Sequence, residues 1–86
     1  MHTFLKNNKT IEVGWNISLN TFFGKMYLNN NLVIFVGKTK GEIQTVLDLQ
    51  NQIEIRIPQD IKNKLESDKN SSQSPSTIID NLLDLL

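Results

Sequence analysis

The chain of 86 residues has no cysteine, a single histidine and no long hydrophobic run. The absence of cysteine excludes a disulfide framework, a thiolate metal site and a cysteine nucleophile. His2 alone cannot complete a structural zinc site or a catalytic triad. The longest apolar stretch, residues 32–36, is much shorter than a membrane span, and the first residues lack the apolar core of a signal peptide. We therefore expect a soluble cytoplasmic protein that does not associate with membranes.

Neither sign of charge dominates, because nine basic side chains balance nine acidic ones. The two halves differ, however. Residues 1–40 contain five lysines and one glutamate, whereas residues 41–86 contain eight acidic and four basic side chains. This asymmetry lets the halves attract each other within one fold, and it can alternatively orient the molecule toward a partner.

The clearest structural signal is a β-hairpin in the first half of the chain. Residues 21–28 and 32–37 are rich in aromatic and aliphatic side chains, and three consecutive asparagines separate them. Residues 19–28 also fit helical spacing, which leaves a helix as the alternative there, but Gly24, the aromatic side chains and the asparagines favour a strand. Asparagine tolerates turn conformations better than most residues. A three-residue loop places Leu28 opposite Leu32 and keeps the apolar side chains of one face together.

The second face of this hairpin is apolar as well. Its side chains are Phe23, Tyr27, Val33 and Phe35, arranged around Lys25. A ribbon with two apolar faces must be covered on both sides or expose an apolar patch. We therefore take Phe23, Lys25, Tyr27 and Phe35 as candidate partner-binding residues.

Further strands and helices complete a fold of the α+β class. Residues 3–5 and 10–15 have extended character and are joined by a turn with two asparagines, which predicts an N-terminal hairpin. Trp15 ends this segment, and we expect it at the rim of the core with a partner for its indole N–H. The expected architecture is a small antiparallel sheet of three or four strands, with two short helices packed on one face and a C-terminal tail.

The two helices are expected near residues 45–52 and 58–69. Thr45 is a suitable cap for the first, in which Val46, Leu47, Leu49, Gln50 and Ile53 form the apolar stripe. Pro58 suits the first turn of the second, which would bury Ile61 and Leu65. Between the helices, residues 53–57 alternate with a period of two, as in an edge strand.

Composition divides the chain into a domain, a linker and a tail. Residues 1–69 form the α+β domain, and residues 70–77 contain four serines and have the composition of a flexible linker. Residues 78–86 form an amphipathic, leucine-rich tail that can dock on the sheet, bind a partner or fray. The candidate partner-binding residues of this tail are Leu82, Leu83 and Leu86.

The second half of the chain resembles a ribbon-helix-helix DNA-binding module in the order of residues 52–58, 60–65 and 74–83. This resemblance implies a dimer whose strand reads the major groove through Gln52, Glu54 and Arg56. Glu54 opposes that reading, since it would meet the negative DNA backbone. We therefore keep a dimeric DNA-binding protein as the alternative and do not expect nucleic acid as the partner.

Residues 13–69 also resemble a small uncharacterised bacterial domain. The resemblance is carried by Gly14-Trp15-Asn16, by Thr21-Phe22-Phe23, by a hydrophobic strand ending in Gly37, and by the segment from Pro58 to Lys69. It implies no activity and transfers no functional residue. It supports a domain that ends before the serine-rich segment.

No group of residues specifies a reaction. Gly37-Lys38-Thr39 matches the end of a phosphate-binding loop, but Leu32 occupies the position of its first glycine, so we interpret Gly37 as the end of a strand. The glutamates are dispersed. We expect no catalytic residue, no metal and no cofactor, and a non-enzymatic protein-binding or adaptor module that is a monomer or a weak homodimer.

Overall fold

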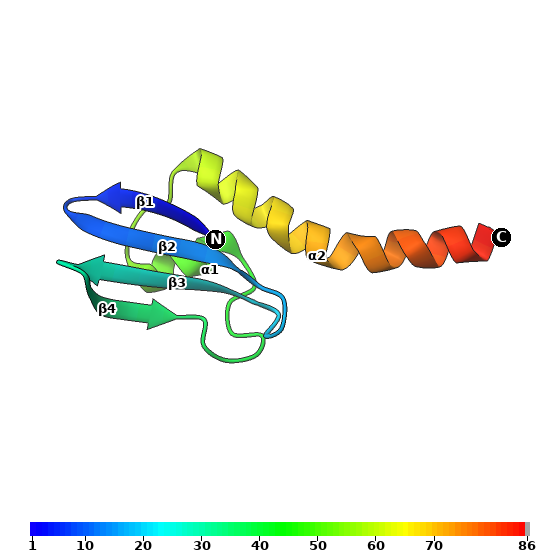
Figure 1. Cartoon of the computed structure of the whole chain (residues 1–86), viewed down its shortest axis with the longest axis horizontal. Coiled ribbons are helices and arrows are strands. Elements are labelled where there is room, and N and C mark those ends of the chain that lie inside the picture. The colour runs from blue at the N-terminus through cyan, green and yellow to red at the C-terminus, as the bar shows by residue number, and fades with distance from the viewer. Residues whose placement is uncertain (86) are drawn as a thin grey trace.

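The computed structural model describes the backbone of residues 1–85 and the side chains of residues 1–72. Four strands and two helices follow one another: β1 (His2–Lys6), β2 (Lys9–Asn16), β3 (Thr21–Leu28), β4 (Asn31–Val36), α1 (Val46–Ile53) and α2 (Gln59–Leu85). The strands form one antiparallel sheet in the order β1-β2-β3-β4, so each strand pairs with its neighbour in sequence (Figure 1). The predicted α+β class and the four-stranded sheet are confirmed.

Asparagines make the turns of the sheet. Asn7 and Asn8 join β1 to β2, and Asn29 and Asn30 join β3 to β4, all four with φ between 51° and 66°. Two consecutive residues with positive φ are characteristic of the hairpin turn that matches the twist of the strands, and asparagine adopts this conformation at low cost.

The β3–β4 turn therefore has two residues, and the predicted three-residue loop is wrong. Leu28 pairs with Asn31 and Tyr27 pairs with Leu32, but Met26 pairs with Ile34 as the longer loop required. The register shift between Met26 and Tyr27 is a β-bulge that absorbs the extra residue. Beyond the bulge, Ile34 and Val36 of β4 therefore lie on the same face of the sheet as Met26.

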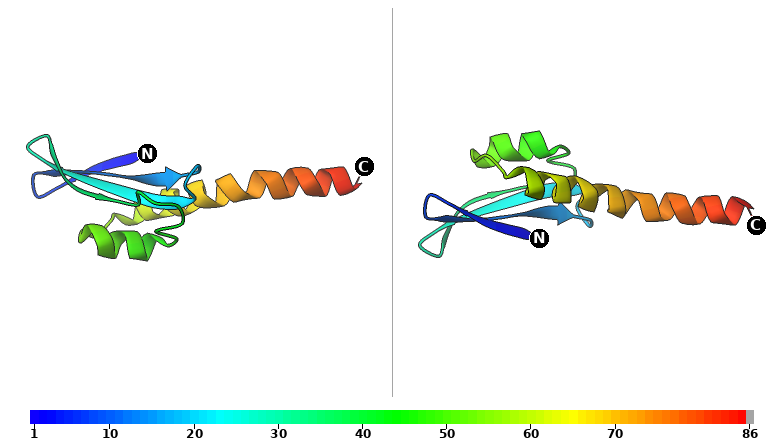
Figure 2. Two further views of the ribbon diagram at one scale, coloured as in Figure 1. Left: turned by 90° about the horizontal axis from the view of Figure 1, so that it is seen from below. Right: turned by 90° about the horizontal axis from the view of Figure 1, so that it is seen from above.

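The two helices cover one face of the sheet, and the opposite face is open (Figure 2). The buried apolar side chains of the covered face and of the helices form one cluster: Ile11, Val13, Phe22, Met26, Ile43, Val46, Leu49, Ile53, Ile57, Ile61 and Leu65. Gly24 lies at the closest approach of α1, because a Cβ atom there would meet Ile53 Cγ2 at 2.8 Å and Leu49 Cδ1 at 3.1 Å.

Thr45 caps α1, as predicted, and accepts a hydrogen bond from the backbone N–H of Asp48 at 3.1 Å. Val46, Leu49 and Ile53 are buried, but Leu47 is 65% exposed and does not belong to the apolar stripe. Val46, Leu49 and Ile53 follow the i, i+3, i+7 spacing of one helix face, whereas Leu47 lies about 100° around the helix from Val46 and so points away from the sheet.

The edge strand predicted for residues 53–57 does not form. Ile53 is the last residue of α1, and Glu54 follows it with φ 59° as a left-handed cap. The next residues connect to α2, held by a hydrogen bond of 2.9 Å from the N–H of Ile57 to Gln50 Oε1. Gln52, Glu54 and Arg56 therefore share no strand face of the kind that the ribbon-helix-helix resemblance implies.

The helix α2 is much longer than the predicted short one, and its backbone continues through residues 70–77, where we expected a linker. It begins directly after Pro58 and buries Ile61 and Leu65, as predicted. The C-terminal half of α2 projects beyond the sheet and does not return to the face of the sheet that the helices leave uncovered (Figures 1 and 2).

Contacts between α2 and the sheet extend past the predicted domain end at Lys69. The Trp15 indole Nε1 donates to Ser72 Oγ at 2.8 Å, which provides the expected partner for a tryptophan at the core rim. His2 Nε2 lies 2.7 Å from Asp68 Oδ2 and joins β1 to α2, a role that its terminal position did not indicate.

Candidate functional site

The face of the sheet opposite the helices carries the side chains that the sequence pattern predicts on the second apolar face of the hairpin. Phe23, Lys25 and Tyr27 project to it from β3, and Phe35 lies opposite Lys25 on β4. Phe23 and Tyr27 are half-buried, and Phe35 is 36% exposed. We call this surface the open face and define it by these four residues.

A hollow of about 380 Å³ lies at one end of the open face. Its lining residues come from the end of β2, from β3 and β4, and from the loops that follow β2 and β4: Asn16, Leu19, Phe23, Lys25, Phe35, Gly37 and Lys38. The lining thus combines two aromatic rings and a leucine with two lysines, and it contains no acidic side chain. Three of the four predicted residues line this hollow, and Tyr27 lies outside it.

Two ammonium groups lie against the Phe35 ring. Lys25 Nζ is 4.8 Å from the ring centroid and Lys38 Nζ is 5.2 Å from it. The negative face of an aromatic ring attracts a cation at these distances. This attraction keeps both positive charges beside the apolar surface.

Gly14 sets the position of the Phe23 ring. The two residues are cross-strand partners, and a Cβ atom at Gly14 would lie 2.7 Å from Cε1 and Cζ of Phe23. The ring therefore lies over the glycine backbone, in space that any larger residue would occupy. The hollow depends on this glycine as well as on the aromatic side chains.

A carboxylate of the same chain holds the segment that contributes Lys38. Glu42 accepts hydrogen bonds from the Gly37 amide at 2.7 Å, from the Thr39 hydroxyl at 2.8 Å and from the Thr39 amide at 3.3 Å. The Thr39 hydroxyl, followed by the Gly37 amide, lowers the pKa of Glu42 below its ordinary value of 4.5. The Gly37-Lys38-Thr39 segment thus folds around the carboxylate of Glu42. Gly37, with φ 82°, follows the last residue of β4 and ends the strand, as predicted.

Tyr27 belongs to a neighbouring hollow of about 370 Å³ with Thr10, Glu12 and Asn30. Partial desolvation raises the pKa of the Tyr27 hydroxyl above its ordinary value of 10.0, and the charge and hydrogen bonding of Glu12 act in the same direction. The Tyr27 hydroxyl therefore remains protonated at neutral pH and can donate a hydrogen bond.

Alternation along the strands identified Phe23, Lys25, Tyr27 and Phe35, but it could not identify the loop residues of the hollow. Leu19 and Lys38 belong to the loops that follow β2 and β4, and they lie beside Asn16, the last residue of β2, only in the folded chain. The predicted tail residues Leu82, Leu83 and Leu86 lie outside the described side chains.

Within the part of the chain that the structure describes, no group of three or more metal-ligating side chains lies together. No described helix is long and apolar enough to cross a bilayer. No family model matches the chain, and the searches of curated proteins and of solved structures found no match either.

Proposed function

We propose that the chain is a small non-enzymatic binding module whose open face docks an acidic segment of a protein partner that also carries apolar side chains. The observation that carries this proposal is the hollow in which Phe23 and Phe35 lie beside Lys25 and Lys38. We further propose that the module acts in the cytoplasm as a monomer.

The apolar part of the proposal rests on exposure. Leu32, which pairs with Tyr27, is 49% exposed, and Val33 in the bulge is 52% exposed, so β4 extends the apolar surface of Phe35. Apolar surface that continues across neighbouring strands is typical of interaction sites, and aromatic side chains supply much of the binding energy there. A partner leucine or aromatic ring would fill the hollow.

The acidic part of the proposal rests on charge. Among the described residues, neither Lys25 nor Lys38 has an acidic side chain within ion-pair distance. Glu42, the nearest acid in sequence to Lys38, is engaged by the backbone and hydroxyl of its own loop. Glu12 of β2 is the cross-strand neighbour of Lys25, but no ion pair joins them, so a partner's carboxylates would not have to displace an existing ion pair at either lysine.

Selection from a random displayed peptide library against the full-length protein tests the proposal. We expect the enriched peptides to combine aspartate or glutamate with leucine, phenylalanine or tryptophan. Phe35→Ser and Lys25→Glu should each weaken the binding of a synthetic enriched peptide about tenfold or more, as expected for anchors of an interface.

Lys64→Glu is the matched control, because Lys64 is exposed on α2 and does not line the hollow. This variant should bind like the unchanged protein, and circular dichroism should show that all variants are folded. Peptides without an acidic bias, or peptides that bind the Phe35→Ser and Lys25→Glu variants unchanged, would refute the proposal. A concentration-dependent dimer that Lys25→Glu dissociates would also refute it, since a second copy would then occupy the open face.

A further inference from the structure

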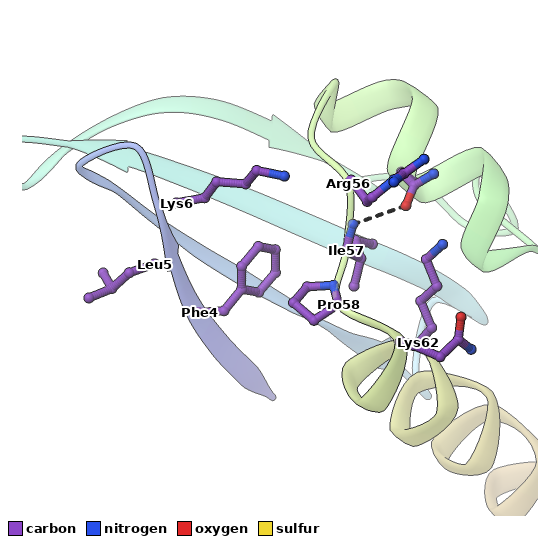
Figure 3. A pocket seen from close by; sticks show the side chains of 9 residues that line it. Phe4, Leu5, Lys6, Arg56, Ile57, Pro58 and Lys62 are labelled. Carbon is purple, nitrogen blue, oxygen red and sulfur yellow. Dashed lines mark hydrogen bonds between the residues drawn. The ribbon is translucent and has the colours of Figure 1, made fainter.

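A third hollow, with a different lining, lies where β1 meets the connection between the helices. Its volume is about 440 Å³. It is lined by Phe4, Leu5 and Lys6 of β1, by Gln50 of α1, by Arg56, Ile57 and Pro58 of the connection, and by Gln59 and Lys62 of α2. Figure 3 shows Lys6, Arg56 and Lys62 around the apolar side chains of Phe4, Ile57 and Pro58.

Three cations from three different segments converge on this hollow, and no carboxylate lines it. The acidic residues nearest in sequence, Glu54 and Asp60, are absent from the lining. Within residues 1–72, none of the three cations lies within ion-pair distance of an acidic side chain. The N-terminal end of the long helix α2 lies at the same place, and Asp60 in its first turn already offsets part of the positive end of the helix dipole.

The wall of the hollow is apolar and held in place. Ile57 is 1% exposed and belongs to the core, and its N–H donates to Gln50 Oε1 at 2.9 Å. This hydrogen bond fixes the connection that carries Arg56. Phe4 packs against the core from the other side of the hollow. The apolar wall is thus preformed by contacts that no ligand has to create.

We propose that this hollow binds a small molecule that joins phosphate groups to a flat ring system, which is the chemistry of a nucleotide. Its volume lies in the range of small-molecule sites, roughly 300–1,000 Å³. The Arg56 guanidinium can bind a phosphate through two parallel hydrogen bonds, and the two lysines add point charges. The ring system would lie along Phe4 and Pro58, which border the same hollow.

Titration of the ¹⁵N-labelled full-length protein with ATP, in the absence of divalent cations, tests this proposal. We expect saturating shifts of the backbone amides of Lys6, Ile57 and Lys62, with a Kd of about 1 mM or lower. Arg56→Gln and Lys62→Gln should each weaken binding about fivefold or more, because each removes one charge-assisted contact with phosphate. Lys64→Gln, which changes an exposed lysine of the same helix outside the hollow, should leave the Kd unchanged.

Inorganic triphosphate separates the two parts of the ligand. It should bind more weakly than ATP, since it cannot contact the apolar wall. Equal affinity for triphosphate, no shift with about 10 mM ATP, or shifts that are insensitive to both Arg56→Gln and Lys62→Gln would each overturn the proposal. None of these results depends on the open face, because this hollow shares no lining residue with either hollow of the open face.

Discussion

The indole N–H of Trp15 donates a hydrogen bond of 2.8 Å to the hydroxyl of Ser72, which lies 57 positions later in the chain. Trp15 also packs edge-to-face against Phe22, with ring centroids 4.9 Å apart, and Ser72 Oγ donates to the carbonyl of Lys69. The bond joins the end of β2 to the part of α2 that follows the predicted domain boundary. Ser72, which lies beyond Lys69, therefore contacts the folded domain through its side chain.

Replacing Ser72 by alanine should lower the free energy of unfolding by about 1 kcal/mol, because the partly buried indole N–H loses its partner. Urea denaturation followed by Trp15 fluorescence measures this loss. Ser71→Ala is the matched control, since Ser71 is exposed. Equal stability of the two variants would show that the hydrogen bond contributes nothing.

Shortening the chain also tests the predicted domain end at Lys69. A protein that ends at Lys69 should stay folded, since the buried cluster ends at Leu65, but it should be less stable than a protein that ends at Gln73. The difference should be at least as large as the effect of Ser72→Ala. Circular dichroism and urea denaturation of both shortened proteins measure it, and loss of all folded structure in the shorter one would contradict the account.

The two strand glycines should respond differently to substitution by alanine. Gly24→Ala should destabilise the protein by about 1–3 kcal/mol, because the new methyl group is pressed against Ile53 and Leu49 of the core. Gly14→Ala should cost less, since its methyl group would be pressed only against the tip of the Phe23 ring, which can turn aside, and would make an ordinary contact of 3.5 Å with Met1 Cα. Chemical denaturation compares the two variants, and a larger loss for Gly14→Ala would contradict the assignment of the covered and open faces.

Acid should release the loop that Glu42 holds. The Thr39 and Gly37 hydrogen bonds favour the carboxylate, so its pKa lies below 4.5 in the folded protein. The contribution of these bonds is complete above the ordinary pKa of a glutamate and is lost as the pH falls through the lower folded value. The amide chemical shift of Gly37 should follow this titration, and Glu42→Gln should abolish it. A midpoint at or above 4.5 would be inconsistent with the geometry.

Much of the sheet could be predicted from the sequence because its signals are local. Asparagine pairs favour tight turns, and the alternation of apolar residues places Phe23, Lys25 and Tyr27 on one face. The bulge beside Tyr27 could not be predicted, since a two-residue turn with a bulge and a three-residue loop give the same pairing of Met26 with Ile34. Local pattern does not distinguish these solutions.

The second half of the chain was predicted less well because long-range contacts decide its structure. Ile55 and Ile57 alternate as in a strand, yet they lie in a connection that follows the end of α1, from which Ile57 is buried in the core and Ile55 packs against it partly buried. The serines after Lys69 favour a linker by composition, but α2 continues through them and Ser72 contacts Trp15. The strand prediction is wrong because tertiary contacts outweigh local propensity there, whereas the domain boundary at Lys69 stays a prediction.

The most direct test of the account is the accessibility of the open face in the full-length protein. Paramagnetic line broadening by a soluble gadolinium chelate should reach the ring protons of Phe35 and Tyr27, while the methyl groups of Ile11 and Leu49, which are fully buried, stay protected. Protected Phe35 and Tyr27 rings, with nuclear Overhauser contacts to residues 78–86, would mean that the tail of the chain covers this face and would contradict the account.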